Sequence, residues 1–270
     1  MAQITVNGIS VEYQLHGPQD GPPLVFIAGM GGAGSFWAPQ LDAFIRSYRV
    51  LVYDQRGTGG TERVKVDSIE QLAEDLIALM RKLDILDAHL VGHSTGGAIA
   101  MVVAERAPEL VRSLVLYASV HRADAYRRRV WGLRKLILQR LGPEVYARTT
   151  SLFFYPPEYV AQNDAEIQLA EQRVAASEVP APEIQASRID AILNFEHVEP
   201  LSRVKAPALV YCAEDDMLTP AYFSREIASL IPGARLTLVP RGGHAFSRSR
   251  TREFNDTVLT FLASQTESQS

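Results

Sequence analysis

Three side chains of the kind used in nucleophilic catalysis stand far apart along this sequence, and the first of them is Ser94. It lies in the stretch Gly92-His-Ser-Thr-Gly96, after a short apolar run and before a run of small residues. A Gly-x-Ser-x-Gly pattern between a strand and a helix is typical of a sharp turn that exposes the serine hydroxyl. Because a serine hydroxyl is a poor nucleophile without a base, acyl transfer at Ser94 would need a histidine and a carboxylate close by.

Among the six histidines, His244 is the predicted base. It follows an apolar run, and the two glycines before it, Gly242 and Gly243, let the chain bend over the end of that run. His93 is the neighbour of Ser94, but adjacent residues of a strand point in opposite directions, so His93 cannot easily reach the hydroxyl. No pattern brings the other four histidines to Ser94; they are His16, His89, His121 and His197.

The carboxylate expected to orient His244 is Asp216. It ends a run of three acidic residues after an apolar run, four residues before the expected start of a helix at Pro220. Asp215 remains the alternative, and Asp124 is a more distant one. The resulting chain order of serine, acid and histidine is the one found in α/β-hydrolases.

Backbone N–H groups are expected to stabilise the negative charge that develops on the attacked carbonyl oxygen. Thr95, directly after the serine, is predicted to supply one, and Met30 in the glycine-rich segment 28–32 the other. Gly29 and Gly31 are expected to leave room for the substrate. A phosphate- or dinucleotide-binding role is not indicated for this segment, because it lacks both the G-x-x-x-x-G-K-[ST] pattern and the acidic partner of a dinucleotide site.

The composition restricts the partners. The chain has 270 residues, of which 47% are hydrophobic, and its net charge is −4. Binding to nucleic acid or to an anionic membrane is therefore not expected, and the longest apolar runs fall short of the about 18 residues of a membrane span. The single cysteine, Cys212, allows no disulfide within the chain and is expected to be buried and unreactive. The predicted partner is a small-molecule substrate, with no cofactor and no metal ion, and the chain is expected to be a monomer or a homodimer.

Two stretches of the sequence bear on location and surface. The first residues lack a basic segment followed by an apolar one, so no signal peptide is indicated and a cytoplasmic location is expected. The basic stretch 122–140 has apolar residues interleaved with its arginines and is expected to be the solvated face of a helix.

Strand-like and helix-like segments alternate from residue 24 to residue 120, which predicts a parallel sheet with helices on both faces. The segment before them, with a turn at Asn7-Gly8, is expected to form an antiparallel hairpin at the sheet edge. After residue 120 the chain becomes helical, aromatic and rich in proline, and the alternation then returns. The expected divisions are a core of residues 1–120 and 201–264, a helical insertion of residues 121–200 and a disordered tail of residues 265–270.

These motifs together make the chain resemble the α/β-hydrolases over nearly its full length. The resemblance rests on AGMGG, YDQRGTG, GHSTGG, AEDDMLTP and GGH, in the expected order. Within that superfamily, IAGMGGAGSFWAPQL, YDQRGTGG, LFFYPPEYV, CAEDDMLTP and GGHAF resemble the aminoacrylate hydrolases of the pyrimidine-utilisation pathway, and the 3-oxoadipate enol-lactonases are a second similar group. Two departures stand out. Ala28 replaces a histidine that many members carry, and Ser94 stands where the aminoacrylate hydrolases have a different residue.

The resemblance implies an α/β-hydrolase fold, with a mostly parallel eight-stranded sheet, an N-terminal antiparallel hairpin, helices on both faces and a helical cap. It also implies a cofactor-free serine hydrolase of a small ester, lactone, amide or carbamate, acting through an acyl-enzyme on Ser94. A lyase or haloperoxidase-like enzyme and a slow-turnover ligand receptor are the alternatives. Arg56 and Arg122 are candidates for binding a substrate carboxylate. The cap residues expected to line the pocket, each of which could equally serve packing, are Trp131, Phe153, Phe154 and Tyr155.

Overall fold

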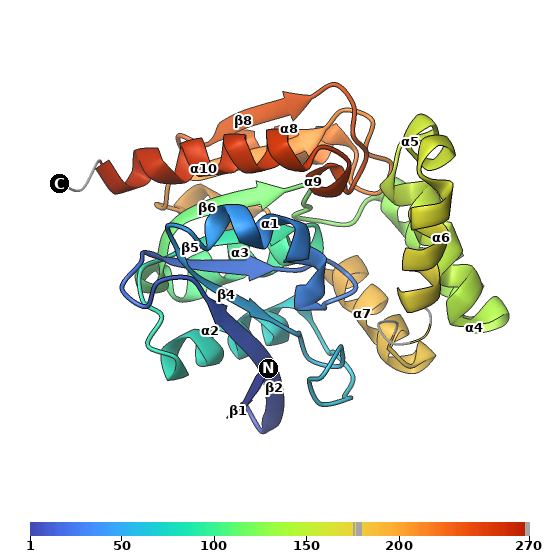
Figure 1. Cartoon of the computed structure of the whole chain (residues 1–270), viewed down its shortest axis with the longest axis horizontal. Helices are drawn as coiled ribbons and strands as arrows, with labels where there is room; N and C mark the ends of the chain where they lie inside the picture. The colour runs from blue at the N-terminus through green and yellow to red at the C-terminus, as the bar shows by residue number, and fades with distance from the viewer. Residues whose placement is uncertain (175, 177–179, 268–270) are drawn as a thin grey trace.

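A computed structural model describes residues 1–174, 176 and 180–267, and its centre is one eight-stranded sheet (Figure 1). The strands are β1 (Ala2–Val6), β2 (Ile9–His16), β3 (Pro23–Ile27), β4 (Arg49–Tyr53), β5 (Ala88–His93), β6 (Val111–Tyr117), β7 (Ala208–Ala213) and β8 (Arg235–Val239). They lie in the order β1-β2-β4-β3-β5-β6-β7-β8. The predicted α/β-hydrolase architecture is confirmed.

The first two strands form the predicted antiparallel hairpin. Asn7 and Gly8 both have positive φ, at 46° and 79°, as a tight hairpin turn of this kind requires. β2 also pairs antiparallel with β4, while the remaining neighbours, from β4 to β8, pair in parallel. In this parallel part the carboxyl ends of the central strands lie level, because Ile27 pairs with Gly92 and His93 with Tyr117.

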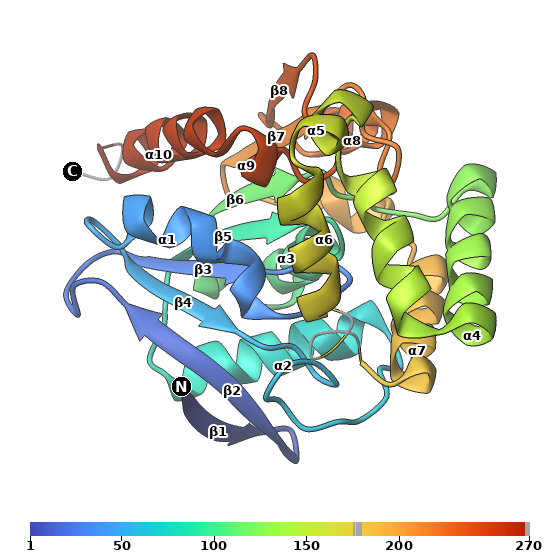
Figure 2. The ribbon, with the colours of Figure 1, turned by 45° about the vertical axis from the view of Figure 1, so that its right-hand side comes forward.

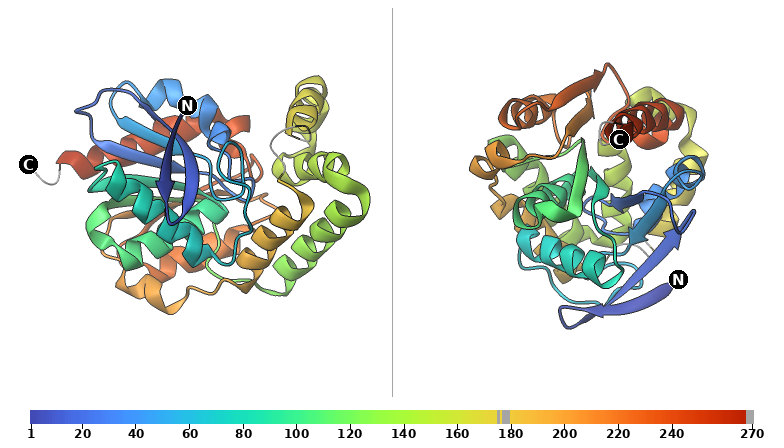
Figure 3. Two further views of the ribbon diagram at one scale, coloured as in Figure 1. Left: turned by 90° about the horizontal axis from the view of Figure 1, so that it is seen from below. Right: turned by 90° about the vertical axis from the view of Figure 1, so that its left-hand side faces the viewer.

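Helices cover both faces of the sheet (Figure 3). On one face Val25 and Ile27 of β3 join the cluster that holds α2, α3 and α8, whereas Leu24 and Phe26 join the cluster with α1 and α10 on the other. Burial on both faces explains why β3 reads as a continuous apolar run. The core helices are α1 (Ala38–Phe44), α2 (Ile69–Lys82), α3 (Thr95–Arg106), α8 (Ala221–Leu230), α9 (Phe246–Ser249) and α10 (Thr251–Glu267), with short 3₁₀ turns η1 (Gly34–Trp37), η2 (Pro108–Leu110) and η4 (Glu199–Arg203).

The segment between β6 and β7 forms a helical cap over the carboxyl edge of the sheet (Figure 2). Its first helix is bent, because Gly142 has φ 82° and ψ 178° and Pro143 follows it. The bend turns the second half of this helix back across the core, toward the end of β8. The cap helices are α4 (Ala125–Phe154), α5 (Pro157–Gln162), α6 (Asp164–Arg173) and α7 (Pro182–Asn194).

The basic stretch in α4 is only in part the solvated face that its composition suggests: Arg128, Arg129 and Arg140 are exposed as predicted, but two other arginines are not. Arg127 and Arg134 are 1% and 2% exposed, whereas Leu133 and Leu136 are 52% and 51% exposed. The buried residues Arg127, Trp131, Arg134 and Leu138 recur at helical spacing, so the arginines share the inward face with the tryptophan. The prediction was wrong for these two arginines because the inward face of this helix contacts polar groups rather than a purely apolar core.

The last helix is longer than expected. α10 continues to Glu267 and so includes residues 265–267, which the sequence assigned to a disordered tail; residues 268–270 lie outside the described part. Its amino-terminal half packs Phe254 and Val258 on the sheet, and that burial stabilises the helix.

No helix in the described part of the chain is both long and apolar enough to span a membrane.

Candidate active site

Ser94 stands on a strained turn between β5 and α3. Its φ of 54° and ψ of −116° lie in a region that residues with a side chain rarely adopt, at a cost of about 1–3 kcal/mol. Two hydrogen bonds hold it there: the Ser94 N–H donates to the Tyr117 carbonyl, and the Ser119 hydroxyl donates to the Ser94 carbonyl, each at 2.8 Å. Such a turn projects the serine side chain away from the sheet and toward solvent or a cavity.

The glycines around Ser94 are required by close approach of the backbone. A Cβ atom at Gly92 would overlap the Gly96 carbonyl, and one at Gly96 would overlap the carbonyl oxygen of Ile27. Even alanine would therefore push α3 away from the sheet. The Gly-x-Ser-x-Gly pattern thus follows from how tightly the strand, the turn and the helix pack.

Asp216 and His244 form a buried hydrogen-bonded pair at the same edge of the sheet. The Nδ1 atom of His244 lies 2.8 Å from Oδ2 of Asp216, and the two residues are 1% and 3% exposed. The other oxygen of Asp216 accepts from the backbone N–H groups of Leu218 at 2.8 Å and Thr219 at 2.9 Å. With the carboxylate accepting at Nδ1, the network assigns the ring proton to that nitrogen and leaves Nε2 as the basic atom.

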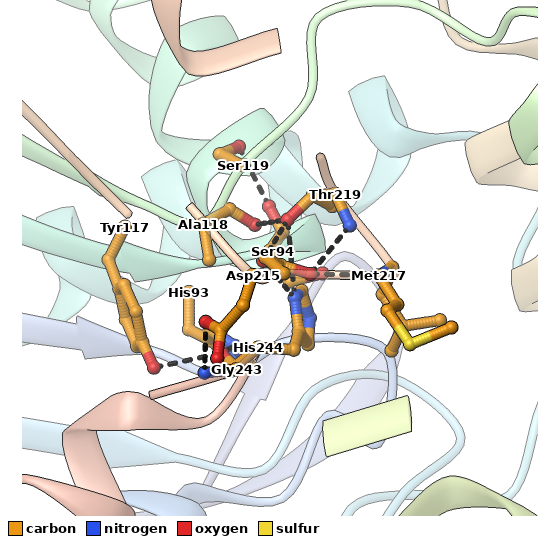
Figure 4. Close-up of polar contacts among 12 residues, drawn as sticks. His93, Ser94, Tyr117, Ala118, Ser119, Asp215, Met217, Thr219, Gly243 and His244 are labelled. Atoms are coloured by element: carbon orange, nitrogen blue, oxygen red, sulfur yellow. Dashed lines mark hydrogen bonds and ion pairs between the residues drawn. The ribbon is translucent and has the colours of Figure 1, made fainter. Parts of the chain in front are cut away.

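Further contacts fix the two halves of this pair (Figure 4). The Thr219 hydroxyl lies 2.7 Å from Asp216 Oδ2 and 2.8 Å from the Ala118 carbonyl. The Tyr117 hydroxyl donates to the backbone carbonyl of His244 at 2.8 Å. The orientation of the imidazole is therefore determined by strands β6 and β7 together.

The alternative carboxylates have other roles. Asp215 accepts from the N–H groups of Gly242 at 3.0 Å and Gly243 at 2.8 Å, so it shapes the turn that leads to His244 without contacting its ring. Asp124 caps α4 by accepting from the Arg127 N–H at 2.9 Å.

His93 lies beside the pair as a neutral packing residue. Its ring stacks on Phe36 with centroids 4.5 Å apart, and its Nε2 lies 3.1 Å from the His244 carbonyl. Burial, and to a smaller extent the nearby His244, holds the pKa of His93 well below its usual value. His93 therefore supports the backbone of His244 and stays uncharged at neutral pH.

Ser94 and His244 line the same cavity, which has a volume of about 380 Å³ between the core and the cap. Of the residues expected to bind substrate, Gly29, Gly31, Trp131, Phe154 and Tyr155 line it. Phe153 does not line it; its ring instead lies 5.2 Å from the guanidinium carbon of Arg134. Adjacent residues of a helix point about 100° apart, and here Phe154 is the one of the two phenylalanines that faces the cavity.

The two backbone N–H groups expected to bind an oxyanion belong to residues at the cavity and at the start of α3. Met30 lines the cavity, and Thr95 is the first residue of α3. Within the described residues, neither N–H donates a hydrogen bond to a backbone or side-chain acceptor. The positive end of the α3 dipole adds to the preference for negative charge beside Ser94.

Comparison with known proteins gives the family. Residues 22–247 match the family described as "alpha/beta hydrolase fold". The chain is 39% identical over 250 residues to "Putative carbamate hydrolase RutD" of Azorhizobium caulinodans, covering 92% of this chain and 93% of that one. This chain is a member of the α/β-hydrolase family.

Two further likenesses point the same way. A relative of the same name from Caulobacter sp. (strain K31) is 34% identical to this α/β-hydrolase, over 97% of this chain and 98% of the other. The crystal structure of the enol-lactonase from Burkholderia xenovorans LB400 superposes with a TM-score of 0.89 at 28% identity, covering 97% of this chain and all of that one. The similarity to both groups named from the sequence motifs is thereby confirmed.

The cap of this α/β-hydrolase contributes polar residues to the cavity that sequence reasoning missed. Arg134, Tyr146 and Gln185 line it and are buried. Arg134 donates from Nη2 to the Thr150 hydroxyl at 2.7 Å, but its Nε and Nη1 have no partner in the described part of the chain. The same is true of two other buried atoms, Oε1 of Gln185 and Nε1 of Trp131. The only signal in the sequence is the inward spacing of Arg134 with Trp131.

The two arginines considered for substrate binding are paired elsewhere. Arg56 forms a largely buried ion pair with Asp75 at 2.7 Å, and Arg122 pairs with Glu226 at 2.8 Å. Neither lines the cavity among the described residues, so the interpretation of both as carboxylate ligands was wrong.

Both ends of α4 are joined to the loops that carry Asp216 and His244. At its start, the Arg127 guanidinium donates to the Leu218 carbonyl at 3.0 Å, two residues after Asp216. At its end, the Phe154 carbonyl accepts from the Ala245 N–H at 3.0 Å, one residue after His244. The cap is thus connected directly to the backbone next to the acid and the base.

Proposed function

We propose that this protein is a serine hydrolase that cleaves a small ester, lactone, amide or carbamate through an acyl-enzyme on Ser94. The observation that carries the proposal is the shared cavity: a serine on a strained turn lines it together with a histidine whose other nitrogen is bonded to a buried carboxylate. This is the arrangement of nucleophile, base and orienting group that acyl transfer needs.

In the proposed reaction, Oγ of Ser94 attacks the substrate carbonyl carbon while Nε2 of His244 takes the hydroxyl proton. Asp216 keeps the proton on Nδ1 and stabilises the imidazolium that forms. The N–H groups of Met30 and Thr95 donate to the oxyanion of the tetrahedral intermediate. His244 then gives its proton to the leaving group, and a water molecule deprotonated by the same nitrogen releases the acid and restores Ser94.

Arg134 is proposed to bind an acidic group of the substrate. Its guanidinium carbon lies 4.7 Å from the Tyr146 ring, 5.0 Å from Trp131 and 5.2 Å from Phe153, so aromatic contacts hold the side chain. No described residue pairs with its Nε or Nη1. A buried donor without an acceptor costs about 1–3 kcal/mol, and a carboxylate would remove that cost. Glu166 and Glu171 also line the cavity, and Glu166 lies on the exposed side of α6.

The comparisons support this choice of bond. One set of relatives is named for carbamate hydrolysis, and a solved neighbour at 28% identity is an enol-lactonase. Both reactions place a nucleophile on a carbonyl carbon that bears an oxygen or nitrogen leaving group. A cavity of about 380 Å³ favours compact substrates over long acyl chains.

The direct test is covalent labelling of the serine. A fluorophosphonate should modify the protein once, on Ser94, and Ser94→Ala should remain folded, unlabelled and lower in activity by several orders of magnitude. Small p-nitrophenyl esters, lactones and carbamates, with and without a carboxylate, give the substrate preference. In ¹⁸O-labelled water the acid product should carry one solvent oxygen.

Two results would overturn the proposal. Labelling on another residue, or substantial turnover by Ser94→Ala, would remove the acyl-enzyme. A product without solvent oxygen would indicate a lyase or an oxidative reaction in its place.

A further inference from the structure

The glycine-rich segment 28–32 is held by hydrogen bonds from outside it. Nε2 of Gln55 donates to the Ala28 carbonyl at 2.7 Å, and the backbone N–H of Gln55 donates to the Gly32 carbonyl at 2.9 Å. These bonds fix the two ends of the segment. Its middle contains the Met30 N–H, and the Gly32 N–H donates to the Gly29 carbonyl at 3.0 Å, which closes a turn around Met30. Glycine on both sides of Met30 gives this turn a conformational freedom that further contacts can remove.

The cap adds a further contact through Arg188 of α7. Its guanidinium donates from Nε to the Met30 carbonyl at 2.9 Å and from Nη1 to the Arg56 carbonyl at 2.9 Å. Nη2 donates to Oε1 of Gln55. One side chain therefore joins α7, the middle of the glycine-rich segment and the loop after β4, and all three of these acceptors are uncharged.

The charge of Arg188 lies in the protein interior. The residue is 2% exposed, and burial lowers its pKa to about 10, so it remains protonated at neutral pH. A positive charge in a medium of low dielectric acts strongly on a negative charge that forms nearby. Its nearest hydrogen-bond acceptor in segment 28–32 is the carbonyl of Met30, the residue whose N–H faces the developing oxyanion in the proposed reaction.

We propose that Arg188 is a positioning residue for the oxyanion hole, because it holds the peptide unit next to the one that carries the Met30 N–H. The Gly29 carbonyl, in the same peptide unit as the Met30 N–H, accepts from the Gly32 N–H, and the Met30 carbonyl, in the following unit, accepts from Arg188. The two bonds together restrict the rotation about Met30 that sets the direction of its N–H. The inference rests on the serine mechanism proposed above and extends it to a cap residue that is absent from the described lining of the cavity. Since Arg188 does not reach the substrate, its loss should affect the transition state far more than substrate binding.

The test uses p-nitrophenyl acetate and its thiono analogue, in which sulfur replaces the carbonyl oxygen. Sulfur accepts hydrogen bonds poorly, so the ratio of the two rates reports how well the oxyanion hole is formed. Arg188→Gln should lower kcat for the oxygen ester by about 10- to 100-fold with little change in KM, less than the about 100- to 1000-fold loss on removing an oxyanion donor, because the Met30 N–H is misdirected but still present. The ratio of the oxygen-ester rate to the thiono-ester rate should therefore fall as well. Arg188→Lys, which keeps the charge and one donor, should give an intermediate ratio.

The matched control is Arg112→Gln. Arg112 donates from Nε to Asp87 at 2.9 Å at the amino-terminal end of β6, the edge of the sheet away from Ser94. This variant loses a charged contact without touching the segment 28–32, so its rate ratio should equal that of the wild type. A general loss of stability lowers both rates together and leaves the ratio unchanged.

The outcomes separate the two proposals. If folded Arg188→Gln keeps the wild-type kcat and rate ratio while Ser94→Ala is inactive, the role of Arg188 is overturned and the serine mechanism stands. If Ser94→Ala is active, both proposals fall. Should Arg188→Gln not fold, a wild-type ratio in Arg188→Lys overturns the positioning role, because one ammonium group cannot replace three directed N–H bonds.

Discussion

The Asp216–His244 pair at the carboxyl edge of the core and the polar residues of the cap differ in how fully their buried polar atoms are hydrogen-bonded. In the core, both oxygens of Asp216 have partners, and Nδ1 of His244 is bonded to one of them. In the cap, Arg134 and Gln185 face the cavity with polar atoms that have no partner among the described residues. In the proposed mechanism the pair must hold one geometry during the reaction, and its polar atoms are hydrogen-bonded by the fold; the cap atoms without a partner are the ones proposed to bind the substrate.

The largest effect is expected from a substitution in the fully hydrogen-bonded Asp216–His244 pair. Asp216→Asn should lower kcat by about 10⁴-fold, because an amide can favour the wrong tautomer of His244. Asp215→Asn is the matched control, since within the described residues the Asp215 carboxylate accepts hydrogen bonds from the backbone N–H groups of Gly242 and Gly243 and not from His244. Steady-state kinetics with p-nitrophenyl acetate measure both variants. Equal losses would mean that Asp216 has no special part in the chemistry.

A smaller effect is expected from removing the cap guanidinium that lacks partners for two of its nitrogens. Arg134→Met should raise KM for a carboxylate-bearing ester by about 10- to 100-fold, the value of a hydrogen bond to a charged group, while KM for a neutral ester of similar size stays the same. Arg122→Met, which removes the pair with Glu226 and the guanidinium contact with the Phe223 ring, should change neither value, because neither contact partner is among the described residues that line the cavity. A parallel rise for acidic and neutral esters would show that Arg134 supports the shape of the cavity and does not bind an anion.

Buried histidines give a test by pH, because burial keeps them neutral whereas it leaves Arg188 of the cap charged. Burial lowers the pKa of His89 and of His121 to about 4, whereas an unfolded histidine titrates near about 6.5. Below about pH 6.5 these histidines therefore bind more protons in the unfolded chain than in the folded one. Stability should therefore fall as the pH drops from about 6.5 to 4, by up to about 1.4 kcal/mol per pH unit for each such histidine, and should not depend on them above pH 7.

Urea unfolding at several pH values measures this loss. His89→Asn removes one of the titrating groups and should make the decline shallower. A decline of equal steepness in that variant would mean that His89 is protonated in the folded protein too.

The smallest effect is expected at the outer face of the cap. Leu133 precedes Arg134 but is half exposed, so Leu133→Lys should change the free energy of unfolding by less than about 0.5 kcal/mol and leave KM unaltered. Thermal unfolding and the same ester assays test this. A clear rise in KM would indicate that Leu133 and Arg134 face the same side of α4.

The sequence was informative for the core because the core motifs are local. A Gly-x-Ser-x-Gly turn needs close backbone approach within a few residues, and parallel strands bring their carboxyl ends to one edge, so Ser94, Asp216 and His244 could be assigned from their places after apolar runs. Sequence proximity did not separate Asp215 from Asp216; their hydrogen bonds in the structure differ.

The cap was harder to predict because the environment of each helix face depends on what lies opposite. Phe153 and Phe154 are adjacent and chemically identical, and only the packing of the bent α4 directs Phe154 to the cavity and Phe153 to Arg134. Arg134 itself was hidden in a stretch whose composition suggests a solvated surface. Hydrophobic periodicity places polar residues on the outer face of a helix, so it gives the wrong face for a polar residue that lines a cavity.

The attachment of α4 at both ends has a consequence for engineering. Its start is tied beside the carboxylate and its end beside the imidazole, so the cap is not an independent module that can be exchanged between relatives. A chimaera carrying a foreign cap would have to recreate both anchor points before its active-site loops regained their spacing. Changes of substrate preference are better sought by replacing single side chains inside the existing cap than by grafting a new one.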